Sequence, residues 1–507
     1  AEYMGKLEEM EYEHGEQLHL MFLPLMAHGH TIPLIDIAKM FASRGLKVSI
    51  LTTEANAPSR VWAFERTDAI ALPIHLITVR FPTEEVGLAE GFETLDAIMT
   101  SDNPSALVFK FITSLSILRK PVEEIIQDKK PHCLVADMFF PWATQSAAKF
   151  GIPRLVFHGL SHFSLCIMEC MKLHQPQLSV SSDYERFLVP DLPGEIKLSK
   201  SQLTFFERAD VGEDVSRVLN ECKESWETSS GVIVNSFYEL EPEYASFYRQ
   251  ILRGRMWHIG PVSLAHTEIQ EKSQRGVRST MSKSDCMSWL ASKKKGSVVY
   301  ICFGSTTAFS SFQLREIAEG IEASGHNFLW VWNEKRSKGH EQEGKDWVPR
   351  GFRERTKERG LIIGGWAPQV LILEHEAVGG FVTHCGWNSV IEGITAAVPL
   401  VTWPVWADQF FNEILVIEFL KIGVSVIQRA EALGGGDVVK SGMIAKAVRS
   451  IMDGNEAHEM SERVKNLSEM AKRAFQIGGS SHTSFESLID TLKLETMGKA
   501  SPPMYSA

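Results

Sequence analysis

The chain has 507 residues, 44% of them apolar and 23% charged, which is enough to build a buried core in two or three domains of ordinary size. Its formal net charge at pH 7 is −11, and its basic residues are scattered rather than massed. Because binding to nucleic acid and electrostatic anchoring to a membrane both need a concentrated basic face, we exclude both functions. The seven cysteines form no CxxC pair and no Cys/His cluster with zinc spacing. We therefore expect reduced thiols, no metal site and a cytoplasmic protein.

The chain starts with an acidic stretch, which is unlike a signal peptide, and residues 1–17 are expected to form a flexible extension. The first apolar run, Leu18–Ala27, is much shorter than the roughly 20 residues that span a bilayer, so we expect no membrane span.

The first half alternates short apolar runs with helical stretches. We predict a strand at Leu18–Leu25, a loop at Met26–Ile32, and a helix from Pro33 to Arg44 with the proline in its first turn. Further strands are predicted at Val48–Thr52, Cys133–Ala136, Leu155–His158 and Gly231–Asn235. Runs that are apolar on both faces and separated by helices are typical of a parallel sheet.

The second half repeats this pattern. A strand at Ser297–Phe303 precedes a helix at Ser311–Ser324, and strands follow at Phe328–Val331, Leu361–Ile363, Gly380–Val382 and Leu400–Trp403. A polar stretch, Ala265–Ser284, separates the halves and has linker composition.

We therefore predict an α/β fold of two doubly wound, Rossmann-like domains that face each other across a cleft. The expected parts are an N-terminal domain over 18–258, a linker over 259–284, a C-terminal domain over 285–480, and a C-terminal helix and tail over 481–507 that pack back towards the N-terminal domain. Ligands of such sheets bind beyond the carboxyl ends of the strands, so both domains should present functional loops to the cleft.

The strongest motif is the 44-residue stretch from Trp366 to Gln409. A strand is expected to end at Thr383 and a helix to begin at Asn388, which leaves backbone N–H groups free at a positive helix end. That geometry suits a pyrophosphate. Taken alone, the turn could equally be an ordinary capped helix with tryptophans filling the core.

Over its full spacing this stretch resembles the signature box of the plant family 1 UDP-glycosyltransferases. The resemblance extends from about Leu18 to about Leu492 and includes Phe22–His30, Val234–Glu241 and Trp257–Pro261. Within that family the chain is most similar to tobacco-type phenylpropanoid and flavonoid glucosyltransferases and their saponin-modifying relatives. The resemblance implies the GT-B fold, with UDP-glucose as co-substrate and no other cofactor.

The resemblance also implies roles for individual positions. Trp366 would stack on uracil, while Ala367 would read its edge through its backbone. The residues implied near the ribose are Gln369 and Glu392, those at the phosphates are Ser305, His384, Asn388 and Ser389, and those at the sugar are Trp387, Asp408 and Gln409. In this family, glutamine at the last position usually accompanies UDP-glucose.

Transfer to a hydroxyl needs a base, and histidine is suited to that task near neutral pH. The first loop contains His28 and His30. The matching family motif puts the base at His30 and an orienting aspartate at Asp137, which ends a predicted strand. Each residue alone could be structural, and Asp137 could simply cap the next helix. An in-line attack should invert the anomeric carbon, and no metal is implied, because a helix end and side-chain donors can bind the diphosphate.

The acceptor pocket is predicted from aromatic and methionine residues in loops, because such side chains suit flat, lipophilic molecules. They are Met26, Met138, Phe139, Phe140, Trp142, Phe205, Phe206 and Trp406. Flavonoids and other phenolics are favoured as acceptors, with triterpenoid or steroidal aglycones as the alternative. The segment Gln428–Asp437 departs from the pattern of similar proteins.

Two functions of other classes stay open. A UDP-sugar epimerase with this fold would also hold UDP in the cleft, but it has no reason to carry the Trp366–Gln409 stretch. A non-catalytic UDP-sugar binder would keep that stretch but lose His30 or Asp137. We expect a monomer whose only partners are UDP-glucose and a small lipophilic acceptor.

Overall fold

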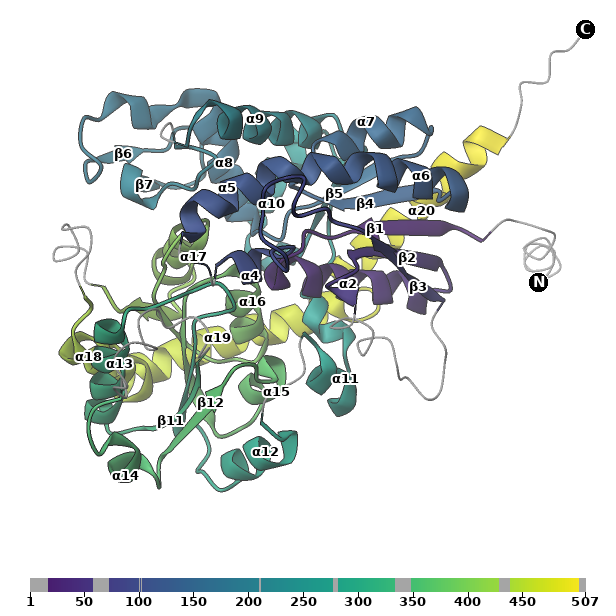
Figure 1. The fold of residues 1–507 in the computed structure, drawn as a ribbon. Helices are drawn as coiled ribbons and strands as arrows, with labels where there is room; N and C mark the ends of the chain where they lie inside the picture. Colours follow the sequence, from purple (N-terminus) through teal and green to yellow (C-terminus); the bar gives the residue numbers. More distant parts are fainter. Residues whose placement is uncertain are drawn as a thin grey trace, which may run out of the picture.

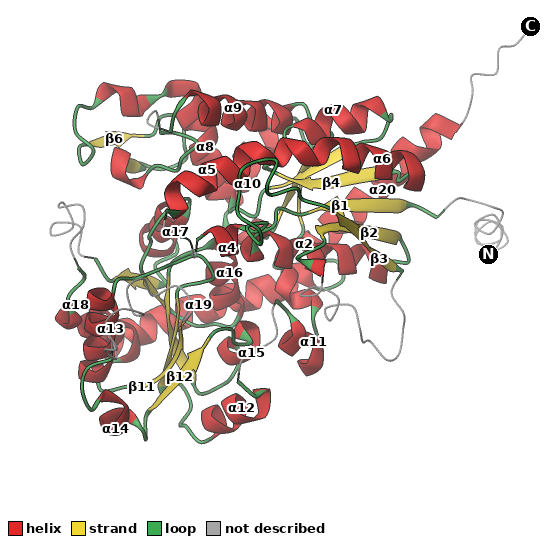
Figure 2. Ribbon diagram, viewed as in Figure 1, coloured by secondary structure: helices red, strands yellow, loops and turns green. Residues whose placement is uncertain are grey.

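The computed structural model describes residues 17–57, 73–99, 101, 103–208, 211–276, 281–332, 348–427 and 438–500. Three parts of the chain that the sequence singled out lie outside the described residues. They are residues 1–16 of the expected extension, the segment Gln428–Asp437 and the tail after residue 500. Within the described residues, the chain forms two α/β units, one above the other in Figure 1, each with a parallel sheet between helices (Figure 2). The predicted fold class is confirmed.

The N-terminal unit holds a seven-stranded sheet in the order β3-β2-β1-β4-β5-β8-β9, in which every neighbouring pair is parallel. Its strands are β1 (His19–Leu23), β2 (Lys47–Thr53), β3 (Ile74–Val79), β4 (Cys133–Asp137), β5 (Arg154–Phe157), β8 (Gly231–Val234) and β9 (Met256–His258). A small antiparallel pair, β6 (Arg186–Leu188) and β7 (Lys197–Ser199), lies apart from it.

The C-terminal unit holds a six-stranded parallel sheet in the order β12-β11-β10-β13-β14-β15. Its strands are β10 (Val298–Cys302), β11 (Asn327–Trp332), β12 (Gly360–Gly364), β13 (Val378–Thr383), β14 (Leu400–Thr402) and β15 (Gly423–Ser425). In both sheets the chain reverses its winding direction next to the first strand, between β1 and β4 and between β10 and β13. Ligands of doubly wound sheets bind at such a point.

Helices connect these strands and cover both faces of each sheet. In the N-terminal unit they are α2 (His28–Ser43), α4 (Leu95–Ile98), α5 (Pro104–Ser114), α6 (Arg119–Lys129), α7 (Trp142–Lys149), α8 (His162–His174), α9 (Glu213–Glu227) and α10 (Pro242–Ile251). From the linker onwards they are α11 (Ile269–Gln274), α12 (Lys283–Ala291), α13 (Ser311–Ser324), α14 (Phe352–Thr356), α15 (Gln369–Leu373), α16 (Trp387–Thr395), α17 (Gln409–Ile414), α18 (Ser441–Met452), α19 (Gly454–Phe475) and α20 (Ser480–Ala500).

Strand β1 is apolar at four of its five positions, Leu20 to Leu23, because both of its faces are buried. Leu20 and Phe22 belong to the core cluster on one face of the sheet, whereas Met21 and Leu23 belong to the cluster on the other face. Successive side chains of a strand point to opposite faces, so a strand covered by helices on both sides favours apolar residues at every position. The strand stops at Leu23 rather than at the predicted Leu25, because Pro24 has no N–H to donate to the ladder.

The predicted loop at Met26–Ile32 is wrong, because helix α2 already begins at His28. The carboxylate of Asp96 accepts the backbone N–H of His28 (2.9 Å), which satisfies one of the open donors of the helix N-terminus and favours the positive end of the helix dipole. Pro33, which was placed in the first turn, therefore lies inside the helix. Sequence rules for helix starts missed this because the capping carboxylate comes from another helix.

The C-terminal helix α20 runs back beneath the N-terminal unit (Figure 1). Its side chains Phe485, Leu488, Ile489 and Leu492 share a core cluster with residues of α2 and β1. Phe485 packs edge-on against Phe41 with ring centroids 4.8 Å apart. The last helix of the chain thus completes one face of the first sheet.

Replacing Leu488 with alanine should lower the free energy of unfolding by about 2–5 kcal/mol, because the side chain is fully buried and its loss leaves a cavity. Denaturant unfolding followed by circular dichroism measures the change. The matched control is Leu494→Ala on the same helix, where the side chain is 70% exposed and a change within about 0.5 kcal/mol is expected. Equal effects of the two variants would contradict the packing described for α20.

Candidate active site

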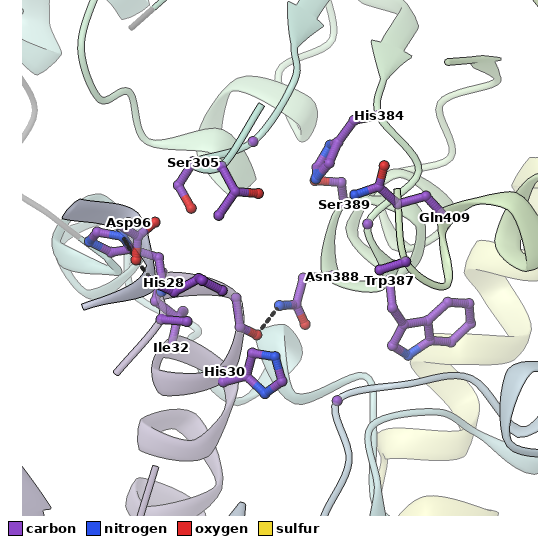
Figure 3. A pocket seen from close by; sticks show the side chains of 18 of the residues that line it. His28, His30, Ile32, Asp96, Ser305, His384, Trp387, Asn388, Ser389 and Gln409 are labelled. Carbon is purple, nitrogen blue, oxygen red and sulfur yellow. Dashed lines mark hydrogen bonds and ion pairs between the residues drawn. The ribbon is translucent and has the colours of Figure 1, made fainter. Parts of the chain in front are cut away.

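A cavity of about 660 Å³ lies between the carboxyl ends of the two sheets and is lined by residues of both units. Helix α2 and the end of β4 approach it from the N-terminal unit, and the turns after β10 and β13 approach it from the C-terminal unit. Figure 3 shows His28 and His30 of α2 facing Asn388, Trp387 and His384 across this space. The cavity therefore occupies the winding reversal of both sheets at once.

His30 and Asp137 meet at the cavity wall. The Nδ1 atom of His30 lies 2.8 Å from Oδ2 of Asp137, whose side chain is fully buried behind it. Burial opposes the charged imidazole, but the charge and hydrogen bond of Asp137 outweigh it, so the pKa of His30 is raised above 6.5. Donation from Nδ1 to the carboxylate leaves Nε2 as the nitrogen with a lone pair. The base and orienting residue expected from the sequence are in direct contact.

A second histidine–aspartate pair, His28 and Asp96, lines the same cavity. The Nδ1 atom of His28 lies 2.7 Å from Oδ2 of Asp96. Burial opposes ionisation of Asp96, but His28 first and Ser305 after it outweigh burial and lower the pKa of Asp96 to about 2. The His28 ring also lies 5.3 Å from the ring of Trp366. The sequence analysis missed Asp96, since nothing in its local sequence ties it to the start of α2.

Helix α16 carries four of the predicted donor residues, and the side chains of two of them, Trp387 and Asn388, reach the N-terminal unit. Asn388 donates from Nδ2 to the carbonyl oxygen of Gly29 (2.6 Å; Figure 3), and Trp387 donates its indole N–H to the carbonyl of Asn235 (2.7 Å). The Gly29 carbonyl is open because its helical donor would be the N–H of residue 33, and Pro33 has none. The Trp387 indole N–H is therefore engaged, which leaves its ring and backbone to face a ligand.

The side chain of His384 lies between Gly304 and Gly386, and it leaves no room for a Cβ atom on either glycine. A Cβ atom on Gly304 would lie 2.5 Å from the imidazole, and one on Gly386 would lie 2.6 Å from it. Burial lowers the pKa of His384 to about 4, so the ring is neutral at physiological pH and offers one N–H donor. Ser305 follows Gly304 on the same loop and also lines the cavity.

The two predicted ribose residues, Gln369 and Glu392, are hydrogen-bonded to each other. Gln369 donates from Nε2 to Oε2 of Glu392 (2.8 Å) and to the hydroxyl of Ser389 (3.2 Å). Trp366 and Ala367 precede this group and line the cavity beside it. The other oxygen of Glu392 pairs with Arg275, a residue of the predicted linker that the sequence analysis did not single out.

Asp408 and Gln409 close the cavity at the start of α17. Burial raises the pKa of Asp408 to about 6, although Asn412 and His30 act in the opposite direction. The side-chain oxygen of Gln409 accepts the backbone N–H groups of Val405 (2.8 Å) and Trp406 (3.0 Å). Because its oxygen is engaged in this way, Gln409 presents its NH₂ group as the part that can bind a ligand.

Five of the eight residues predicted for the acceptor pocket line the cavity, namely Met138, Phe139, Phe205, Phe206 and Trp406. Phe139 and Phe206 stack with ring centroids 5.8 Å apart. The wall is completed by apolar residues of α5 that the sequence analysis did not identify: Val108, Phe111 and Ile112.

The other three predicted pocket residues, Met26, Phe140 and Trp142, are core residues instead. Phe140 is fully buried and packs edge-on against Trp142 with ring centroids 5.6 Å apart. Trp142 donates its indole N–H to the carbonyl of Leu115 (3.3 Å), which turns its polar edge inwards, and Met26 is 5% exposed. The run that follows β4 is therefore divided between cavity and core. Met138 and Phe139 line the cavity, whereas Phe140 and Trp142 pack in the core.

Among the described residues, no three histidine, cysteine, aspartate or glutamate side chains come close enough together to ligate a metal ion. In that same part of the chain, none of the helices combines the length and the apolar character that crossing a membrane requires.

Comparison with known proteins gives consistent matches. A family model described as UDP-glucoronosyl and UDP-glucosyl transferase matches residues 261–473. The scopoletin glucosyltransferase of Nicotiana tabacum is 47% identical over 476 residues, which cover 94% of this chain and 98% of that protein. The UDP-glucose flavonoid 3-O-glucosyltransferase 7 of Fragaria ananassa is 47% identical over 492 residues, covering 95% of this chain and 98% of that protein.

A solved structure extends the likeness to three dimensions. The crystal structure of Glycyrrhiza uralensis UGT73P12, complexed with glycyrrhetinic acid 3-O-monoglucuronide, matches with a TM-score of 0.85 at 39% identity and covers 96% of this chain and 97% of that chain. The match over both units confirms the GT-B fold. With nearly half of its residues shared with relatives over almost their full length, this chain belongs to the family of UDP-glucoronosyl and UDP-glucosyl transferases.

Proposed function

We propose that this enzyme transfers glucose from UDP-glucose to a hydroxyl group of a small lipophilic acceptor, a flavonoid or another phenolic, with inversion at the anomeric carbon. The observation that carries the proposal is the placement of His30. Its imidazole is backed by the buried Asp137 and lines the same cavity as the N-terminus of α16. A base on one wall and an anion site on the other suit transfer between two bound molecules.

The donor would bind against the C-terminal unit. The N-terminus of α16, the hydroxyls of Ser305 and Ser389 and the N–H of His384 would face the diphosphate, where helix dipoles and uncharged donors stabilise negative charge. Trp366 would stack on the base and Glu392 would accept from the ribose. Because these groups also meet the charge that grows on the departing UDP, we propose that no metal is needed.

The acceptor hydroxyl would lie against Nε2 of His30, which removes its proton as the oxygen attacks the anomeric carbon. The leaving UDP and the attacking oxygen lie on opposite sides of that carbon in such a displacement, so an α-linked donor would give a β-glucoside. Asp137 holds the imidazole in the required tautomer and stabilises the cation that forms.

The proposed acceptor class rests on the aromatic wall of the cavity and on the acceptors named for similar proteins. The wall at Phe139, Phe205 and Phe206 is flat and aromatic, which suits a planar ring system. The names of two similar proteins specify scopoletin and a flavonoid as acceptors. Triterpenoid aglycones are the second candidate, because the similar solved structure holds a glucuronide of glycyrrhetinic acid.

The cavity has features that the activity of an epimerase or a non-catalytic binder would not require. Neither would need an apolar wall of acceptor size beside the base, and a binder would not need a buried carboxylate behind His30.

Incubation with UDP-glucose and a panel of coumarins, flavonols and triterpenoid acids should give acceptors carrying one added hexose, detected by mass spectrometry. UDP-galactose and UDP-glucuronate should be poorer donors, because discrimination by single polar contacts such as that of Gln409 is about 10-fold to 100-fold. Addition of a chelator should leave the rate unchanged. A panel that stays unmodified while UDP-glucose is epimerised or left intact would refute the proposal.

Replacing His30 with alanine should lower kcat by about 100-fold to 10,000-fold, while the affinity for UDP stays within about threefold. The base acts as neutral imidazole and its pKa is raised, so kcat/KM should rise with pH through a value above 6.5. Asp137→Asn removes the charge that raises this pKa most and leaves Asp408 and Asp96 in place, so the inflection should move to lower pH. Initial rates between pH 5 and pH 9 measure both effects.

His458→Ala is the matched control, because this histidine is exposed on α19, away from the cavity. An inflection that stays in place in Asp137→Asn would show that His30 is not the group whose ionisation limits the rate.

Gly304→Ala should weaken UDP binding at least tenfold, as measured by calorimetry. The new methyl group would meet the His384 ring, and alanine at φ +71° is strained. Gly325→Ala separates the two causes, because Gly325 has φ +83° but nothing within 4 Å of the added Cβ. That control should lose stability and keep its UDP affinity. Equal losses of affinity in the two variants would argue against His384 as a donor contact.

A further inference from the structure

The linker between the two units reaches into the cavity through Arg275, which follows α11. Its guanidinium is 9% exposed and lines the cavity beside Glu392. The Nε atom lies 2.7 Å from Oδ2 of Asp36 on α2, and Nη1 pairs with Oε1 of Glu392 on α16. One side chain of the linker thus contacts both the helix that carries His30 and the helix that faces the donor.

The charges of this group are compensated. Burial opposes ionisation of Asp36, but Arg275 first and His266 after it outweigh burial and lower its pKa to about 2. Burial likewise opposes the charge of Arg275, and the carboxylates of Asp36 and Glu392 outweigh it and raise its pKa. His266 binds the second oxygen of Asp36 at 2.7 Å. A planar guanidinium can serve two carboxylates at fixed angles, which an ammonium group cannot do equally well.

The next residue, Gly276, packs on the indole of Trp366. Its φ is +101°, and a Cβ atom there would lie 2.3 Å from Cζ2 of the indole. Arg275 and Gly276 therefore contact the two side chains that would hold the nucleoside. Glu392 would bind the ribose, and the ring of Trp366 would stack on the uracil.

We propose that Arg275 is a positioning residue of the donor site, which aligns the Glu392 carboxylate for the ribose hydroxyls and ties it to α2 through Asp36. The inference rests on the proposed use of a UDP-sugar donor. Arg275 occupies Oε1 of Glu392 and Gln369 occupies Oε2. Each carboxylate oxygen can accept more than one hydrogen bond, so Glu392 keeps lone pairs for the ribose while both neighbours hold it in place.

The nucleoside site is then completed by three separate parts of the chain. The C-terminal unit supplies Trp366 and Glu392, the linker supplies Arg275, and the N-terminal unit supplies Asp36. Loss of Arg275 would leave Glu392 free to turn away from the ribose and would leave the buried carboxylates of Asp36 and Glu392 without their shared cation. Both changes weaken binding of the donor without altering His30.

The test compares UDP with 2′-deoxy-UDP by calorimetry on the full-length chain and its Arg275→Gln variant. The wild type should prefer UDP, because Glu392 accepts from the 2′-hydroxyl. Arg275→Gln should bind UDP at least tenfold more weakly, and its preference for UDP over 2′-deoxy-UDP should fall close to one. Its KM for UDP-glucose should rise at least tenfold, with kcat and the acceptor KM within threefold of wild type.

Arg355→Gln is the matched control. Arg355 donates two hydrogen bonds to the carboxylate of Glu322, at 2.6 and 2.9 Å. This pair lies on the surface of the C-terminal unit and outside the cavity, so the variant should bind both nucleotides as the wild type does. Arg275→Lys keeps a charge in the buried position and guards against a folding failure of the glutamine variant. It should show a smaller loss of the preference for UDP.

The outcomes separate the two proposals. A wild type that binds no UDP would overturn the proposed function and this inference with it. A wild type that prefers UDP, together with folded Arg275 variants that keep the same preference or bind UDP as tightly or more tightly, would overturn the role of Arg275 alone.

Discussion

The absence of an N–H group at Pro33 is the constraint on which the geometry of the site depends. Inside an α-helix each carbonyl accepts from the residue four positions on, and a proline there leaves one carbonyl open. In α2 the open carbonyl is that of Gly29, next to His30, and the amide of Asn388 donates to it from the other unit. The open carbonyl of α2 is thus the point where the N-terminus of α16 docks, beside His30 at the cavity wall.

Other hydrogen bonds also join the two units beside the cavity. Trp387 donates to the backbone of Asn235, and Asn412 of α17 accepts from the hydroxyls of Ser161 and Ser164 at 3.3 and 3.1 Å. These are directional hydrogen bonds between buried groups, and a small shift of the units that broke one without admitting water would leave a polar atom unpaired. They fix the relative position of the two sheets more narrowly than apolar packing would. The proposed displacement would need that precision, because His30 and the donor would be held by different units.

The sequence predicted the features that depend on local pattern. The parallel sheets, the donor stretch and the strand ends that carry Asp137 and His384 follow from apolar runs and from one long motif. The start of α2 was misplaced because Asp96, which caps it, is more than sixty residues away. Arg275 was read as part of a polar linker because its carboxylate partners lie on helices of different units. Met26, Phe140 and Trp142 were assigned to the pocket because composition does not tell whether an apolar side chain near a strand end points into the cavity or into the core.

Proton transfer in this site would end with a cation on His30, and both units are arranged to stabilise it. Asp137 contacts the ring directly, and the charge of Asp408 also favours the protonated imidazole. Conversely, burial raises the pKa of Asp408 to about 6, and the charge of His30 is among the groups that act against this rise. Protonation of His30 therefore favours the charged form of Asp408. In the proposed reaction Asp137 would set the tautomer of His30 and Asp408 would respond to its charge from across the cavity, so the two units would share the stabilisation of a single proton.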